Sequence, residues 1–229
     1  MCRRKSELEE ITMMPAENRK PETTYQAYLE ALIRGDRHRC RAMVEEMLKD
    51  EIDIRDLYTG IFQRSLYQVG ELWESNKLTV ACEHMATAIT ESLLPLAYQV
   101  IFSAPHCGRK AVVACAANEY HQLGGKMVAD ILELNGWDGY FLGANTPVND
   151  LLALVDEKRP DMLCLSLSVY TGMPELITLL DRVRGEFSAL PVIVGGQAFR
   201  WGGVDLVTAY SGVRHIGSIF ELEHLVQEW

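Results

Sequence analysis

The chain has 229 residues, of which 48% are hydrophobic, and it carries a formal net charge of −10 at pH 7. This length and composition suit one large domain or two small ones with real hydrophobic cores. The acidic balance argues against a nucleic-acid-binding surface, which would show a basic face. No apolar run reaches the ~18 residues that a membrane helix needs. We therefore expect a cytoplasmic protein that contacts neither nucleic acid directly nor a membrane.

The first half of the chain has helical periodicity. Residues 1–21 are polar and aperiodic, which predicts a disordered lead-in or, alternatively, a short partner-binding arm. Between residues 22 and 104, apolar residues recur at helical spacing in four stretches, at about 23–33, 37–50, 54–73 and 78–102. Gly35 suits the end of the first helix and Asp36 the N-cap of the second. Four amphipathic helices with short connections predict a four-helix bundle, whose last helix would run through Pro95.

After a polar linker, residues 108–229 change to a different period. Apolar runs at 111–116, 139–143, 162–167, 191–195 and 213–216 alternate with helical patterns at about 122–135, 148–158, 173–186 and 218–228. This alternation predicts an α/β domain with a doubly wound, five-stranded parallel sheet of the flavodoxin or Rossmann type. Asn145 and Pro147 predict an N-cap followed by proline at the first helical position. No G-x-G-x-x-G follows the first strand, so a dinucleotide ligand is disfavoured.

Three short segments follow strands of this domain and should meet at the carboxyl edge of the sheet, where open α/β sheets bind ligands. They are Glu119-x-His121-x-x-Gly124, then Ser166-Leu167-Ser168 with Tyr170 and Thr171, then Gly195-Gly196 with Phe199. A histidine that is hydrogen-bonded to a carboxylate is fixed in tautomer and becomes a better metal ligand. A glycine pair lets a wide group approach the backbone. Taken alone, the first segment reads equally well as a βα turn with an incidental histidine.

Together the three segments resemble the signature of the cobalamin-binding superfamily, which is [D/E]-x-H-x-x-G, then S-x-[L/T], then G-G. That family also carries a four-helix bundle ahead of its α/β domain, so the resemblance extends from about residue 23 to the end. It implies that His121 is the lower axial ligand of cobalt and that Glu119 orients it. It also implies that the serines and glycines line a slot for the displaced dimethylbenzimidazole tail, where Phe199 would pack unless it is simply core. Ser168 departs from the Leu or Thr of the family.

A further pattern lies in the predicted bundle, where Trp73 is followed after nine residues by Glu83 and His84. This W-x9-E-H pattern resembles the CarH-type cobalamin photoreceptors. The resemblance implies that Trp73 and Glu83 shape a pocket for the 5′-deoxyadenosyl group of adenosylcobalamin, on the upper face of the corrin. The resemblance also implies that methyl-carrying corrinoid proteins share the fold but lack the tryptophan and glutamate that correspond to Trp73 and Glu83. Without the α/β motifs, Trp73 would read as core and the other two residues as a solvated helix face.

The chain departs from the CarH-type pattern in two ways. Glu74 stands where those photoreceptors have a histidine that caps cobalt after photolysis, and His84 is then the candidate substitute. Only about 21 residues precede the bundle, where those photoreceptors carry a DNA-binding domain. We therefore expect a non-enzymatic, adenosylcobalamin-dependent light sensor that signals through a partner protein or through a change of homo-oligomeric state. The alternatives are a corrinoid methyl carrier of a methyltransferase system, with methylcobalamin, and a cobalamin storage or delivery protein.

Overall fold

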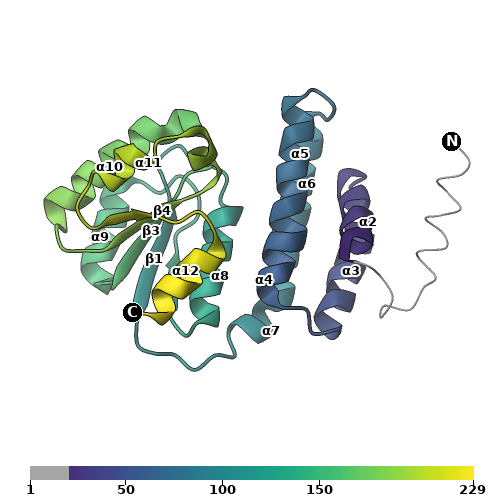
Figure 1. Ribbon diagram of the computed structural model, residues 1–229, viewed down its shortest axis with the longest axis horizontal. Helices are drawn as coiled ribbons and strands as arrows, with labels where there is room; N and C mark the ends of the chain where they lie inside the picture. The colour runs from purple at the N-terminus through teal and green to yellow at the C-terminus, as the bar shows by residue number, and fades with distance from the viewer. Residues whose placement is uncertain (1–20) are drawn as a thin grey trace, which may run out of the picture. The chain divides into compact units, whose positions relative to one another are not determined.

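A computed structural model describes residues 21–229 of the chain, so the first 20 residues of the predicted lead-in lie outside the described residues. The chain forms two compact units, one that ends at Ala97 and one from Tyr98 to Trp229 (Figure 1). In the part of the chain that the structure describes, no helix is both long and apolar enough to cross a membrane.

The first unit is helical, as predicted. It contains α2 (Pro21–Ile33), α3 (Arg37–Lys49), α4 (Ile54–Asp56), the π-helical η2 (Leu57–Gln63), α5 (Arg64–Glu74), α6 (Val80–Leu93) and the 3₁₀ turn η3 (Leu94–Ala97). Asp36 is the predicted N-cap of α3, and its side chain accepts a hydrogen bond from the Arg39 N–H. An aromatic cluster lies at the centre, where the rings of Tyr28 and Tyr58 each have their centroid 6.0 Å from that of Phe62.

The prediction of one continuous helix over 78–102 was wrong. The helix α6 ends at Leu93, the next turn is the 3₁₀ segment η3, and α7 (Tyr98–Ile101) belongs to the second unit. Pro95 is the physical reason, because its nitrogen has no proton to donate and its ring collides with the preceding turn. The apolar periodicity continues through this break, and periodicity alone therefore could not reveal it.

The second unit is the predicted doubly wound α/β fold. Its strands are β1 (Lys110–Cys115), β2 (Asp138–Phe141), β3 (Met162–Ser166), β4 (Val192–Gly195) and β5 (Val213–His215). All neighbours pair in parallel, in the order β2-β1-β3-β4-β5. This is the flavodoxin-like strand order, which reverses its direction of growth between β1 and β3.

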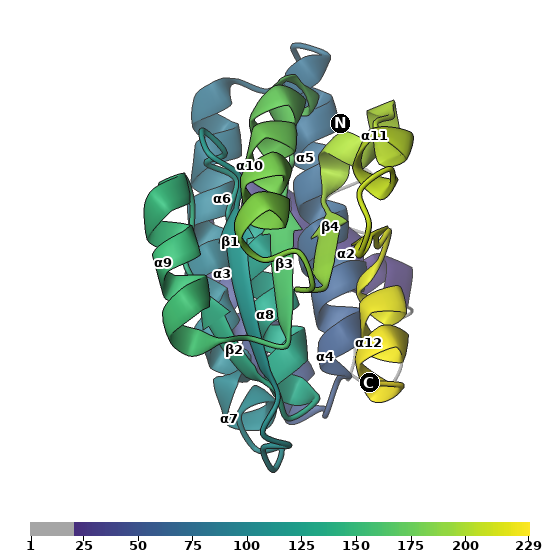
Figure 2. The same cartoon turned by 90° about the vertical axis from the view of Figure 1, so that its left-hand side faces the viewer.

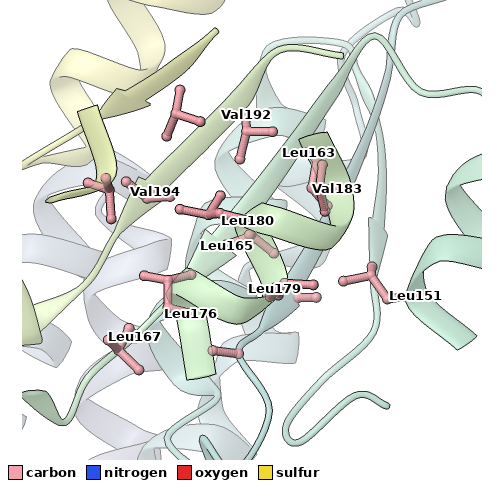
Figure 3. Packing of buried hydrophobic residues seen from close by; sticks show 14 of the residues in the cluster. Leu151, Leu163, Leu165, Leu167, Leu176, Leu179, Leu180, Val183, Val192 and Val194 are labelled. Atoms are coloured by element: carbon pink, nitrogen blue, oxygen red, sulfur yellow. The ribbon is translucent and has the colours of Figure 1, made fainter. Parts of the chain in front are cut away.

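Helices cover both faces of the sheet (Figures 1 and 2). The longer ones are α8 (Leu123–Leu134), α9 (Val148–Lys158), α10 (Met173–Glu186) and α12 (Ile219–Gln227); shorter ones are η4 (Tyr170–Gly172), η5 (Gln197–Trp201) and α11 (Val204–Thr208). The sequence pattern had not indicated α11, which is only one turn long. Between the sheet and α9–α11 lies a core of Leu and Val side chains, among them Leu163, Leu176 and Leu180 (Figure 3). This packing fixes where the strands end and where α10 begins.

Candidate functional site

The site lies where β1 and β3 end side by side. Cys115, the last residue of β1, is paired with Ser166, the last residue of β3. The chain leaves β1 toward β2 on one side of the sheet and leaves β3 toward β4 on the other, so the two following loops diverge around a crevice. In flavodoxin-like sheets this switch point is where ligands bind. The loop after β1 carries Glu119 and His121, and the loop after β3 carries Ser168 and Thr171.

The carboxylate of Glu119 joins the two loops. Its Oε1 atom accepts hydrogen bonds from Nδ1 of His121 at 2.6 Å and from the His121 backbone N–H at 2.7 Å. Its Oε2 atom accepts from the backbone N–H groups of Ser168 at 2.7 Å and Val169 at 3.1 Å. Both oxygens are thus satisfied by donors only. The backbone of Ser168, which is independent of its side-chain type, makes this contact.

These contacts determine the charge of Glu119 and the tautomer of His121. Burial of Glu119 raises its pKa, but hydrogen bonds from the His121 ring and from the backbone N–H groups of His121 and Ser168 outweigh it, so the pKa lies below its usual value. An ionised carboxylate only accepts, so Nδ1 of His121 must carry the proton in this hydrogen bond. The ring lone pair is then on Nε2, the nitrogen that binds metal in such pairs. The Glu119 side chain is 2% exposed and that of His121 is 53% exposed, so the ring is anchored but accessible.

Two asparagines stabilise the loop between β1 and α8 through hydrogen bonds. Asn118 and Asn145 both have positive φ angles, of 63° and 48°, which asparagine tolerates better than most residues. The Asn118 N–H donates to Oδ1 of Asn145 at 2.9 Å, and the Asn145 N–H donates to the Glu119 carbonyl at 2.9 Å. The predicted roles of Asn145 and Pro147 in capping α9 were wrong, because Pro147 itself occupies the N-cap and α9 begins at Val148. The side chain and backbone N–H of Asn145 instead form hydrogen bonds with the loop that carries Asn118 and Glu119, so the side chain does not cap α9.

An open pocket of about 220 Å³ lies beside His121. Its lining comes from both loops and from the first turn of α10: Asn118, Glu119, Tyr120, His121, Leu167, Val169, Thr171, Gly172 and Glu175. The Oε2 atom of Glu175 is buried and has no hydrogen-bond partner within the described chain. A buried carboxylate oxygen without a donor is costly, and because Glu175 as a whole is only partly buried, its carboxylate can meet a ligand that supplies one.

Two predicted residues, Gly124 in the first turn of α8 and Ser166 at the end of β3, lie close to each other. Ser166 is buried at the end of β3, and a Cβ atom placed on Gly124 would lie 3.8 Å from its hydroxyl oxygen. At Gly125 an added Cβ would approach the Phe141 ring to 3.2 Å, so the first turn of α8 packs close to the strands here. Tyr170, also predicted, is exposed on η4 and does not line the pocket with Thr171.

The glycine pair and Phe199 have structural explanations within this chain. A Cβ on Gly195 would lie 2.9 Å from the Ile216 carbonyl oxygen, and one on Gly196, whose φ is 116°, would collide with the Leu167 carbonyl oxygen. Phe199 is 7% exposed, belongs to the core cluster, and has its ring centroid 4.8 Å from that of His215. None of the three lines the pocket beside His121. Their predicted contact with a cofactor tail therefore stays a prediction.

The remaining predicted residues belong to the first unit. Trp73, in the last turn of α5, is 45% exposed, which is unusual for a large aromatic side chain. Glu83 lies in the first turn of α6, where its carboxylate accepts hydrogen bonds from the Thr87 hydroxyl at 2.9 Å and interacts with Nδ1 of His84 at 2.8 Å. The His84 side chain is 75% exposed. The Trp73 indole is thus not buried in the core, although core packing was the alternative interpretation of that residue.

Comparison with known proteins defines the class to which this fold and site belong. Residues 24–96 and residues 109–214 each match a B12 binding domain family. The chain therefore belongs to the cobalamin-binding proteins that combine a helical B12-binding cap with a Rossmann-like B12-binding domain. This confirms the family and the fold class that the motifs predicted.

Individual relatives are regulators and corrinoid proteins. The chain is 34% identical over 125 residues to the HTH-type transcriptional repressor CarA of Myxococcus xanthus, covering 54% of this chain and 43% of CarA. It is 31% identical over 183 residues to the repressor CarH of the same organism, covering 78% of this chain and 59% of CarH. It thus spans less than two thirds of either relative. The monomethylamine corrinoid protein of Methanosarcina barkeri shares the fold, with a TM-score of 0.80, 14% identity, and coverage of 91% of this chain and 99% of that chain.

The residues at the β1/β3 edge fit a corrinoid. His121 presents one oriented ring nitrogen, Nε2, which would hold the cobalt of a corrinoid. The orphaned Glu175 oxygen calls for an N–H donor, and a corrin ring carries peripheral amides. When bound, cobalamin supplies a cobalt atom with exchangeable axial ligands. The chain itself holds the His121 ring in place and keeps its Nδ1 proton on the Glu119 hydrogen bond.

Sequence reasoning missed Asn118 and Glu175. Asn118 carried a local signal, because asparagine directly before a polar loop residue favours the left-handed conformation that it adopts. Glu175 carried none, because an acidic residue in the first turn of a helix is ordinarily explained by the helix dipole. Only the fold shows that this carboxylate faces the same pocket as His121.

Proposed function

We propose that this cobalamin-binding protein is an adenosylcobalamin-dependent light sensor whose output passes through a partner protein or a change of oligomeric state. The observation that carries the proposal is the W-x9-E-H pattern, with Trp73 half exposed rather than buried in the helical core. The similarity to CarA and CarH, which are transcriptional repressors by name, supports a regulatory role.

The proposed chemistry of the first unit is recognition of the adenosyl group. An exposed indole offers a large flat apolar surface for a nucleoside, and a carboxylate accepts hydrogen bonds from ribose hydroxyls. Glu83 keeps one oxygen near His84 and the other near Thr87, so its carboxylate is already oriented. Loss of the adenosyl group would remove these contacts, and a ligand that binds two states unequally shifts their populations.

The test is illumination of the protein loaded with adenosylcobalamin in the dark. We expect green light to change the absorption spectrum and the size-exclusion elution volume. Trp73→Ala should weaken adenosylcobalamin binding about tenfold while leaving methylcobalamin binding unchanged, because only the larger upper ligand would reach the indole. Trp201→Ala is the matched control, since Trp201 is also exposed, at 71%. Identical spectra and elution before and after light would contradict the proposal.

A corrinoid methyl carrier is the second candidate, because Glu74 stands where the CarH-type resemblance calls for a second cobalt-capping histidine. Such a protein would favour methylcobalamin, and Trp73→Ala would then affect both alkylcobalamins equally. The same binding series therefore separates the two candidates.

A further inference from the structure

We propose that Glu175 binds one of the propionamide groups on the lower face of the corrin and so helps to select the corrinoid. This inference rests on the proposed binding of cobalamin at His121 and names a further residue of that same site. Propionamide side chains project from the lower face of a corrin ring, the face on which a lower axial histidine lies. Their N–H groups are the kind of donor that a buried carboxylate oxygen lacks.

The position of Glu175 is fixed by the packing of α10. It lies in the first turn of that helix, between the buried Met173 and Leu176. A Cβ on Gly172 would lie 2.9 Å from Cδ1 of Leu167, so the helix begins in close contact with the loop after β3. The carboxylate is therefore held at the pocket wall rather than on a mobile segment.

The described residues of the pocket lining supply no charged donor to Glu175 and too few oxygen ligands for a metal ion. Among the described residues that line the pocket there is no lysine or arginine, and the other carboxylate, Glu119, already has four donors. A single remaining carboxylate is a poor site for a metal ion, which needs several oxygen ligands. An amide N–H satisfies one acceptor atom and brings no charge that would need compensation.

A purely structural role for Glu175 is the alternative, because acidic residues in the first turn stabilise a helix through its dipole. Asp150 provides the matched comparison: it occupies the first turn of α9 and is exposed. If the dipole were the whole explanation, Glu175→Gln and Asp150→Asn would both lower thermal stability slightly and neither would change the choice of ligand.

The experiment measures the affinity of the full chain for hydroxocobalamin and for its three monocarboxylate derivatives, in each of which one propionamide is replaced by a propionate. Wild type, Glu175→Gln and Asp150→Asn are compared. We expect Glu175→Gln to bind hydroxocobalamin about three- to tenfold more weakly. One derivative should bind wild type at least about tenfold more weakly than hydroxocobalamin, because two carboxylates would face each other, and this penalty should disappear in Glu175→Gln.

The outcomes separate the inference from the function on which it rests. A penalty that is the same in wild type and Glu175→Gln for all three derivatives overturns the assignment of Glu175, even if hydroxocobalamin binds normally. Failure of wild type to bind hydroxocobalamin overturns both. If Glu175→Gln folds poorly, the affinities of the wild-type chain for the three derivatives still test the inference, because three equal affinities would contradict the proposed contact.

Discussion

At the level of single residues, the structure shows how the Glu119 carboxylate of the sequence motif stays charged and orients His121. Glu119 is almost fully buried, yet it stays ionised because four N–H donors converge on its two oxygens. Two of those donors come from the loop after β3. The carboxylate therefore orients the His121 ring and also ties the two loops of the site together.

Replacement of Glu119 by glutamine should reduce cobalamin affinity about 10- to 100-fold, the usual effect of losing the partner that orients a metal-binding histidine. Isothermal titration with hydroxocobalamin measures it. Glu157→Gln is the control, because that side chain is 65% exposed. Equal affinities of Glu119→Gln and wild type would show that His121 does not need the carboxylate.

The same substitution predicts a pH dependence of stability. The folded-state pKa of Glu119 is below the ordinary value of 4.5, so its contribution is fully present above that pH and is lost as the pH falls through the folded pKa. At pH 7 we expect Glu119→Gln to lower the free energy of unfolding by about 1–3 kcal/mol, because a glutamine amide nitrogen cannot accept from backbone N–H groups. Urea unfolding, followed by tryptophan fluorescence, should show this difference shrinking below pH 4.5. A difference that is constant from pH 7 down to pH 3 would contradict the assignment.

At the scale of elements, backbone proximity explains the glycine pair after β4. Gly196 has a φ of 116°, and the Leu167 carbonyl oxygen occupies the space where a side chain at this position would lie. The Leu167 carbonyl also accepts a hydrogen bond from the Ala198 N–H, so it cannot move away freely. The pair is required by the crossing of two loops at the site edge.

Gly196→Ala should therefore destabilise the protein by about 2 kcal/mol or more, because it adds both backbone strain and a steric clash. Gly185→Ala is the matched control: Gly185 lies within α10 and an added Cβ meets nothing within 4 Å. That change should stabilise the protein by about 0.5–1 kcal/mol, since alanine favours helix. Thermal unfolding of both variants tests the comparison, and a harmless Gly196→Ala would refute the steric argument.

The order of strands and helices could be predicted from the sequence because apolar runs alternate cleanly with helical patterns from residue 110 onward. The Glu119-His121 pair could be predicted as neighbours because they share one short loop. The contacts of Glu119 with Ser168 and Val169 could not, since they depend on the register of β1 against β3. The capping of α9 was mispredicted because the Asn145 side chain accepts a hydrogen bond from the Asn118 N–H, 27 residues away, and not from the first turn of its own helix.

At the scale of the whole molecule, the two units carry separate parts of the proposed function. The second unit holds the cobalt-ligating candidate His121, and the first carries the exposed Trp73 and the oriented Glu83. Glu74, next to Trp73 at the end of α5, is the residue that most clearly departs from the CarH-type pattern.

Glu74→His supplies the missing histidine and should change the illuminated state. We expect its spectrum after light to show cobalt with two imidazole ligands even when His84, the other candidate for that position, is replaced by alanine, whereas His84→Ala alone should show one imidazole and one water or hydroxide. His38→Ala serves as a control for nonspecific histidine effects. If the illuminated spectra with and without Glu74→His coincide in the His84→Ala background, position 74 does not face the upper axial position.

The central claim is that His121 is the lower axial ligand of cobalt, and electron paramagnetic resonance of the Co(II) form tests it most directly. The protein is produced with ¹⁵N-labelled histidine and loaded with unlabelled cobalamin. A ¹⁵N nucleus splits each cobalt line into two, whereas the ¹⁴N of the cofactor's own dimethylbenzimidazole splits it into three. We predict doublets in the labelled wild-type protein and their loss in His121→Ala. Triplets that persist in the labelled wild-type protein would show that the tail still ligates cobalt, and would contradict the account.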